Sequence, residues 1–163
     1  MGSRIDTLIA QCPSWDAFRE VVSHQKTTKD KGDLFERLTQ LYLLTSPIYR
    51  SKIKNVWWCN NGELPEQVRK KVNLPSEDEG IDLLCETKAG EFWSVQSKYR
   101  SNSDHPLTTK ELSKFVSLSF VTGKSISQGL IVHTSTKKIK KHTLMGNTVE
   151  IGLQNWLSIK EDE

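Results

Sequence analysis

The chain has 163 residues, a length that suits one domain with one hydrophobic core. Its hydrophobic fraction of 36% and charged fraction of 26% are ordinary for a soluble globular protein, and a net charge of +3 is too small to identify a nucleic-acid binder. No apolar stretch approaches the roughly 20 residues that span a bilayer, and no signal peptide opens the chain, so we expect a cytoplasmic protein that does not enter a membrane.

The predicted elements alternate between helices and strands along the chain. A first helix over about 14–24 begins at Ser14, a good N-cap, and a second over about 31–44 ends at Ser46 and Pro47. This order is that of an α/β fold. The later pattern predicts a strand over 56–59, a turn at 60–62, a short helix over 64–72, hairpin strands over 81–87 and 91–99, a polar loop over 100–106, a helix from 108 or 109 to about 121, strands over 128–133 and 148–151, and a short helix over 153–157.

The predicted hairpin pairs a carboxylate with a polar residue and a lysine. Asp82 lies on its first strand, and Gln96 and Lys98 follow on the second, two positions apart and therefore on one face. If 88–90 form a three-residue loop in which Gly90 has a positive φ, Asp82 lies opposite Gln96 and Lys98 is the diagonal neighbour. A loop of another length would turn Asp82 to the wrong face. Alternation divides the first strand into two faces, with Asp82, Leu84 and Glu86 on one and Ile81, Leu83 and Cys85 on the other.

These residue types suit metal-dependent hydrolysis of a phosphodiester. Carboxylate and amide oxygens are hard ligands suited to Mg²⁺, which is usually held by one or two protein carboxylates. We therefore predict that Asp82 and Gln96 hold the metal, and that Lys98 is the cation that stabilises negative charge developing on the phosphate. The alternative is that Asp82 and Lys98 form a cross-strand ion pair with no catalytic role.

In these motifs the chain resembles the PD-(D/E)xK nuclease superfamily, and in particular its Mrr-like branch, in which Gln often takes the middle position. Asp82 matches the aspartate, and Gln96, Ser97 and Lys98 match the (E/Q)xK element. The branch also carries a glutamate on its first core helix, in a pattern like Gly-x-x-Phe-Glu, which residues 32–36 match and which makes Glu36 an outer or direct metal ligand. The resemblance covers about 31–136 and implies a restriction-endonuclease-like core, with a mixed central β-sheet flanked by helices.

A narrower resemblance is to the N-terminal nuclease domain of type ISP restriction-modification enzymes and related nuclease-helicase fusions. It is carried by residues 32–49, 56–58, 80–83 and 92–98. It implies that 1–163 is a single nuclease domain excised from the N-terminus of a larger protein, with an ATPase or helicase and a methyltransferase elsewhere in the parent chain. No Walker A motif occurs in these residues, so such an ATPase would have to lie outside them.

The predicted function is that of a Mg²⁺-dependent DNA endonuclease, in which Mn²⁺ can substitute, acting on double-stranded DNA in a restriction-modification or helicase-fused anti-phage enzyme. One such site cuts one strand, so a double-strand break requires two domains, as in a transient dimer, or two encounters. Two alternatives stay open. A structure-selective DNA resolvase would use the same residues, and a non-catalytic DNA-binding or docking module would keep the fold without metal dependence.

Several further residues have more than one interpretation. The basic run at 137–142, with Lys137, Lys138, Lys140 and Lys141, could contact DNA phosphates or be a solvated turn, and the same holds for 26–31. We expect His133 to be a hydrogen-bonded residue at a strand end, and the acidic run at 77–79 to be a solvated loop. One of the adjacent tryptophans at 57 and 58 should point into the core. The three cysteines are widely spaced and lack a CxxC pair, which argues against a zinc site and against disulfides: Cys12, Cys59 and Cys85.

Overall fold

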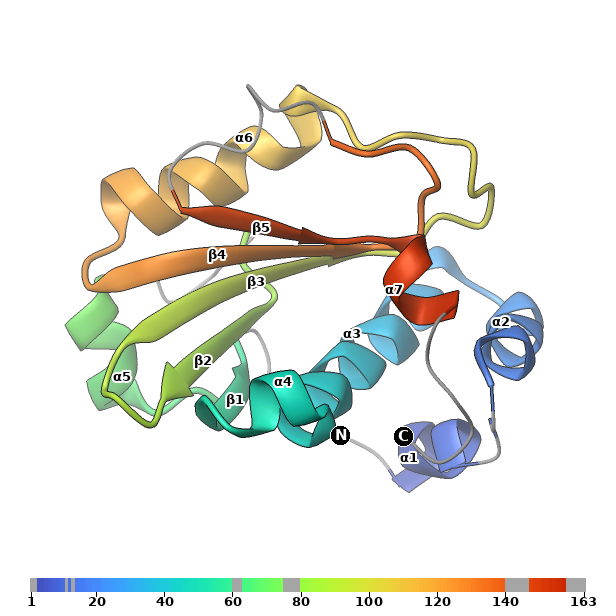
Figure 1. The fold of residues 1–163 in the computed structure, drawn as a ribbon, viewed down its shortest axis with the longest axis horizontal. Coiled ribbons are helices and arrows are strands. Elements are labelled where there is room, and N and C mark those ends of the chain that lie inside the picture. The colour runs from blue at the N-terminus through green and yellow to red at the C-terminus, as the bar shows by residue number, and fades with distance from the viewer. Residues whose placement is uncertain are drawn as a thin grey trace.

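The computed structural model describes residues 3–10, 12, 14–59, 63–74, 80–139 and 147–157. Its centre is a five-stranded sheet in the order β1-β2-β3-β4-β5, in which β1, β2 and β3 are antiparallel neighbours and β4 and β5 continue parallel to β3 (Figure 1). The sheet is therefore mixed, as predicted. The strands are β1 (Ile53–Trp58), β2 (Leu83–Thr87), β3 (Phe92–Lys98), β4 (Ile126–His133) and β5 (Thr148–Ile151).

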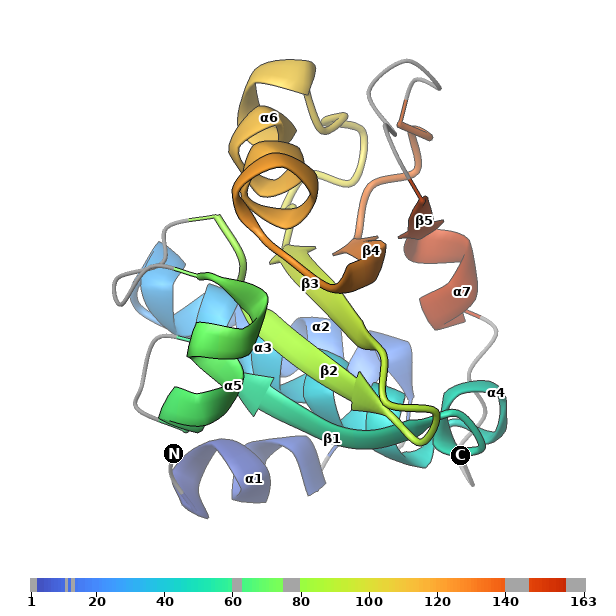
Figure 2. The same cartoon turned by 90° about the vertical axis from the view of Figure 1, so that its left-hand side faces the viewer.

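Helices cover both faces of the sheet, with α6 on one side and α3 on the other (Figures 1 and 2). Among the described residues, no helix combines the length and the apolar character that a membrane span requires. The helices are α1 (Ser3–Ala10), α2 (Trp15–Ser23), α3 (Thr28–Thr45), α4 (Pro47–Arg50), α5 (Glu66–Val72), α6 (Thr109–Ser117) with a π-helical turn over Leu118–Thr122, and α7 (Leu153–Leu157).

The β2–β3 hairpin has the predicted loop and register. Gly90 has a φ of +88°, and the backbone N–H of Thr87 donates to the carbonyl of Glu91 at 2.8 Å, which closes a three-residue loop over 88–90. From this loop the strands pair residue by residue as far as Leu83 opposite Val95. The turn length thus fixes which side chains of β3 lie near the start of β2, as the sequence predicted.

Two apolar clusters lie on the two faces of the sheet. Leu83, Cys85 and Val95 pack on the α3 side, while Leu84 packs on the α6 side. Ile81 also packs on the α6 side, so the prediction that it shares a face with Leu83 and Cys85 was wrong. The reason is that regular strand geometry begins only at Leu83, and strand alternation does not extend to the two residues before it.

Side-chain caps explain where α2, α3 and α6 begin. Ser14 caps α2 as predicted, and its side chain accepts from Ala17 N at 3.2 Å. Helix α3 begins three residues earlier than predicted, because the Thr27 side chain accepts from Asp30 N at 3.0 Å. The helical spacing of Phe35, Leu38, Leu41 and Tyr42 predicts that these residues form the buried side of this helix, and this was only partly right. Phe35 is buried, but the other three are half-buried, while Leu34 and Leu43 are buried as well. The predicted turn at 60–62 and the acidic run at 77–79 lie outside the described residues.

Candidate active site

Asp82 lies where the chain enters β2 and is fixed by both neighbouring strands. Its backbone N–H donates to Val95 O at 2.9 Å, and its carbonyl accepts from Cys59 N at 3.0 Å. Its carboxylate oxygen Oδ2 accepts from the backbone N–H of Ser97 at 2.9 Å. The side chain thus binds the strand that carries Gln96 and Lys98, and the carboxylate is held at the edge of this motif.

Glu36 reaches the same place from α3. Burial first, and then the nearby carboxylates of Asp82 and Asp33, raise the pKa of Glu36 to about 9, and a hydrogen bond to the Asp82 side chain adds to the shift. Without a cation, Glu36 is therefore neutral at pH 7 and donates its proton towards Asp82. The structure brings Glu36 and Asp82 into contact although they are 46 positions apart in the sequence.

Ser94 lies on the face of β3 that points to α6, because its hydroxyl contacts that of Ser119, in the turn after α6, at 2.6 Å. Strand alternation places Gln96 and Lys98 on the same face as Ser94. Gln96 is only 4% exposed, and its side-chain oxygen Oε1 has no hydrogen-bond partner among the described residues. Lys98 is half-buried and forms no ion pair within the part of the chain that the structure describes. The predicted alternative, an ion pair with Asp82, is therefore not formed.

The donor set fits a hard divalent cation. A carboxyl group whose pKa is raised beside a second carboxylate, and a buried amide oxygen with no partner among the described residues, are groups that a cation would satisfy. The described residues contain no group of three or more His, Cys, Asp or Glu side chains suited to a metal. A cation held by Asp82 and Glu36 would keep water in its remaining positions, which is the usual habit of Mg²⁺. Gln96 lies on the α6 face of β3, so its place as a ligand of the same ion stays a prediction.

Residues 44–161 match the protein family Mrr_cat_2, which is described as restriction endonuclease. The chain belongs to this restriction endonuclease family. The matched residues include Asp82, Gln96 and Lys98 but begin after Glu36, so the place of Glu36 in the site rests on its contact with Asp82. A comparison with curated protein sequences gave no significant match.

Two solved structures are similar to this restriction endonuclease family member. One is an ATP-dependent type ISP restriction-modification enzyme, LlaBIII, bound to DNA, with a TM-score of 0.64 and 25% sequence identity over 89% of this chain. The chain spans only 8% of the length of that enzyme. The other is the MspJI restriction endonuclease in complex with a 27-mer oligonucleotide, with a TM-score of 0.48 and 12% identity over 96% of this chain and 34% of that one.

The sequence did not single out the contacts that hold the predicted residues in place. Ser97 binds Asp82 through its backbone, which no residue pattern reveals. Asp33 lies one helical turn before Glu36, so its place beside Glu36 could have been read from the spacing. Asp33 also forms an ion pair with Lys29 at 2.8 Å.

The remaining predicted residues fall outside this site. His133 is buried and hydrogen-bonded, as expected, and Trp58 points into the core. Lys137 and Lys138 are exposed, whereas Lys140 and Lys141 lie outside the described residues. The cysteines are free thiols, with Cys59 and Cys85 buried and Cys12 half-buried.

Proposed function

We propose that this chain is the nuclease domain of a restriction enzyme and hydrolyses phosphodiester bonds of double-stranded DNA with Mg²⁺. The observation that carries the proposal is the contact between the Asp82 and Glu36 carboxyl groups beside the Gln96–Lys98 strand, in a member of a restriction endonuclease family. Burying two carboxyl groups against each other costs free energy and has no evident structural benefit. A metal site accounts for the arrangement, because a bound cation would neutralise both groups.

Each residue has a distinct task in this proposal. Asp82 is the central ligand, held in place by Ser97 N, and Gln96 supplies its unpaired oxygen. Glu36 is an outer or direct ligand that gives up its proton when a cation binds. Lys98, which forms no ion pair with the described residues, faces the phosphate. When bound, Mg²⁺ supplies an activated water and stabilises charge on the phosphoryl oxygens.

DNA and further domains belong to the proposal as well. The type ISP enzyme that is similar to this chain is ATP-dependent and is bound to DNA, and the chain spans a small part of it. We therefore infer that the nuclease works beside an ATPase or helicase, and a methyltransferase, in one larger protein. The similarity of the folds supports this arrangement.

The test is cleavage of supercoiled plasmid by the purified chain with Mg²⁺, Mn²⁺ or EDTA, with Asp82→Ala as the matched variant. We expect metal-dependent cutting that falls by about 100-fold or more in Asp82→Ala. Equal cutting by both proteins would refute the assignment of Asp82.

Two further measurements separate the alternatives. A panel of duplex and branched DNA distinguishes a restriction nuclease from a structure-selective resolvase, since the resolvase would cut the branched substrates alone. If neither protein cuts, calorimetric titration with Mg²⁺ decides: binding to the wild type alone supports a competent site, and binding to neither supports the docking module.

A further inference from the structure

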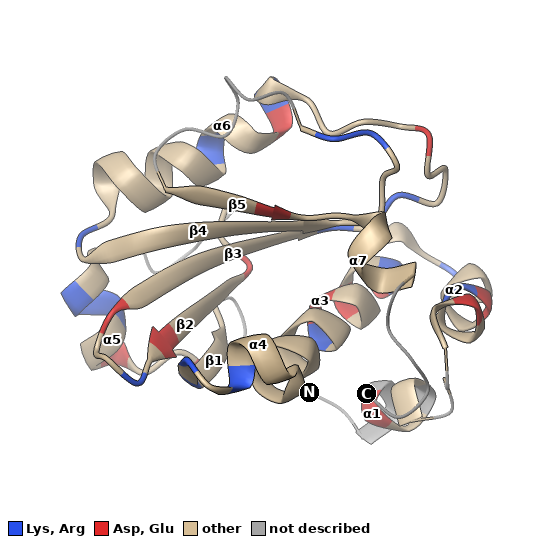
Figure 3. Ribbon diagram, in the orientation of Figure 1, with Lys and Arg blue, Asp and Glu red and all other residues tan. Residues whose placement is uncertain are grey.

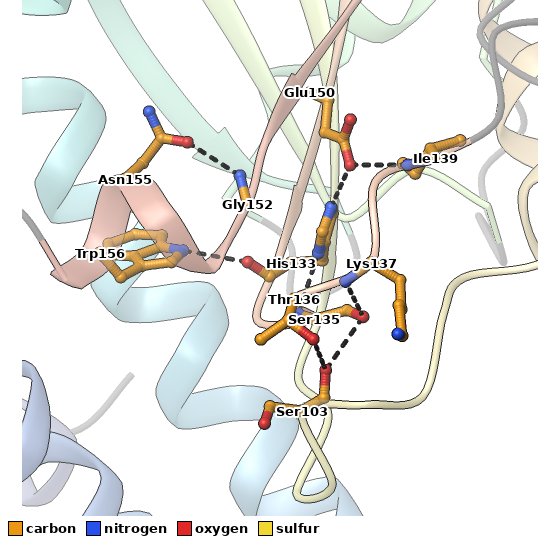
Figure 4. Close-up of polar contacts among 10 residues, drawn as sticks. All are labelled: Ser103, His133, Ser135, Thr136, Lys137, Ile139, Glu150, Gly152, Asn155 and Trp156. Carbon is orange, nitrogen blue, oxygen red and sulfur yellow. Dashed lines mark hydrogen bonds and ion pairs between the residues drawn. The ribbon is translucent and has the colours of Figure 1, made fainter.

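A buried histidine and a carboxylate bind each other at the end of β4, outside the proposed metal site. His133 is 1% exposed, and its Nε2 lies 2.6 Å from Glu150 Oε2 on the edge strand β5 (Figure 4). Its other ring nitrogen, Nδ1, accepts from the backbone N–H of Ser135 at 3.0 Å. Since a backbone N–H can only donate, the ring proton is on Nε2 and points to Glu150.

Glu150 fixes both ends of the segment that leaves β4. The same oxygen, Oε2, accepts from the backbone N–H of Ile139 at 2.9 Å. The near end of segment 134–139 is thus bonded to His133, the far end to Glu150, and the two side chains to each other (Figure 4). One pair of side chains therefore fastens both ends of a six-residue segment.

The segment is also bonded to the loop that follows β3. The carbonyl of Ser103 accepts from Thr136 N at 2.7 Å, from Thr136 Oγ1 at 3.0 Å and from Ser135 Oγ at 3.2 Å. Nearer the sheet, Arg100 N donates to Thr134 Oγ1 at 2.6 Å. The chains that leave β3 and β4 consequently run side by side.

This path begins next to the proposed catalytic lysine. Lys98 and His133 are paired residues of the parallel strands β3 and β4, so segment 134–139 leaves the sheet beside Lys98. Lys137 and Lys138 are exposed on it, and the Lys137 side chain extends away from the bonded residues (Figure 4). Figure 3 shows blue, basic stretches on the chain segments near the end of the sheet where β3 and β4 stop.

We propose that His133 and Glu150 are positioning residues that hold Lys137 and Lys138 against the phosphate backbone of duplex DNA beside the scissile bond. The inference rests on the proposed function, because it places the DNA at Lys98. Exposed lysines on a fixed backbone suit phosphate contacts, which set the register of a protein on DNA without reading its sequence. The buried pair does not touch the DNA and acts through the segment.

The test measures affinity for a short duplex at several salt concentrations, in EDTA so that nothing is cut. Five variants are compared with the wild type: Lys137→Ala/Lys138→Ala, Glu150→Ala, the triple variant that combines these three changes, Glu150→Asp, and Glu150→Gln as the matched control. Glutamine keeps an oxygen that accepts from His133 and Ile139, so Glu150→Gln should bind DNA as the wild type does. Glu150→Asp serves as a second variant, since its shorter side chain keeps the charge but cannot span both partners.

The expected result is non-additive. A plot of log K against log salt has a negative slope. In the double lysine variant this slope should become less steep by about two, one for each lost phosphate contact. Glu150→Ala, or Glu150→Asp if the alanine variant does not fold, should make the slope less steep by the same amount, and the triple variant should lose no more. Additive losses, or a Glu150 variant that folds and keeps the wild-type slope, would overturn the proposal.

The two proposals can fail separately. If the wild type binds no duplex at any salt concentration, the proposed function fails and this inference fails with it. If the wild type binds and the double lysine variant keeps the full slope, the inference fails alone.

Discussion

At the scale of single residues, the proposed site retains polar groups that reduce the stability of the metal-free fold. Gln96 buries an oxygen that has no hydrogen-bond partner in the described part of the chain, and Glu36 buries a carboxyl group beside two others. An unsatisfied buried polar atom costs about 1 to 3 kcal/mol, so these residues oppose folding until a cation binds. This conflict between stability and function can be measured at each residue.

Glu36 should make the metal-free protein less stable as the pH rises. The pKa of Glu36 is about 9 in the folded chain, compared with an ordinary value of 4.5 for the unfolded chain. Between pH 4.5 and pH 9 the folded chain therefore holds a proton that the unfolded chain has lost. The free energy of unfolding therefore falls as the pH rises from about 4.5 to about 9. Glu36→Gln removes this loss and should be more stable than the wild type at pH 8 in EDTA, by roughly 1 to 2 kcal/mol. Urea unfolding at pH 5 and pH 8 measures this; an equal difference at both values would contradict it.

Gln96→Met should separate metal binding from folding. Methionine has a similar shape but no amide oxygen, so the buried acceptor without a partner disappears. We expect the metal-free variant to be more stable by about 1 kcal/mol and to bind Mg²⁺ more weakly. Thermal unfolding in EDTA and calorimetric titration with Mg²⁺ test the two effects. A variant that is less stable in EDTA would show that Gln96 is a structural residue.

At the scale of elements, the hairpin depends on the conformation of a single glycine. Gly90 has a φ of +88°, and a Cβ added there would meet no atom within 4 Å, so Gly90→Ala would be strained by its backbone alone. It should cost about 1 to 2 kcal/mol. Gly32→Ala is the matched control, because its Cβ also meets nothing within 4 Å, but within helix α3. That variant should be more stable by about 1 kcal/mol. Denaturant unfolding gives both values, and equal signs would refute the argument.

How well each element could be predicted from the sequence depends on the range of the forces that form it. The hairpin follows from its loop, and β5 and α7 were predicted with the bounds that the structure has. Helices α1 and α4 were not predicted. The Asp6–Arg37 ion pair at 2.8 Å links α1 to α3 across 31 positions, and Pro47, expected to end a helix, also begins α4. Within the site, the hairpin register brings the start of β2 beside Gln96 and Ser97, whereas the arrival of Glu36 depends on the packing of α3 against the sheet.

At the scale of the whole molecule, aromatic side chains join segments far apart in the chain. The rings of Trp15 and Trp156 lie 5.6 Å apart, those of Phe35 and Trp156 5.4 Å apart, and Trp156 Nε1 donates to His133 O at 3.2 Å. We therefore expect cooperative unfolding as one domain, with coincident transitions by fluorescence and circular dichroism. Trp156→Leu should lower the stability by about 3 kcal/mol or more without separating the two transitions. Separated transitions in the wild type would argue for two units.

The number of sites in one chain determines how DNA would be broken. The described residues present one set with Asp82, Glu36 and Lys98, and in the proposed function one such set hydrolyses one strand at a time. Dilute protein should therefore convert supercoiled plasmid to the nicked form first, and linear DNA should increase more steeply than in proportion to protein concentration, because the second cut needs a second domain. Gel quantification over a series of concentrations measures both products, with Asp82→Ala as the control. Linear DNA that forms without a nicked intermediate, at a rate proportional to protein concentration, would instead mean that a stable dimer cuts both strands in one encounter.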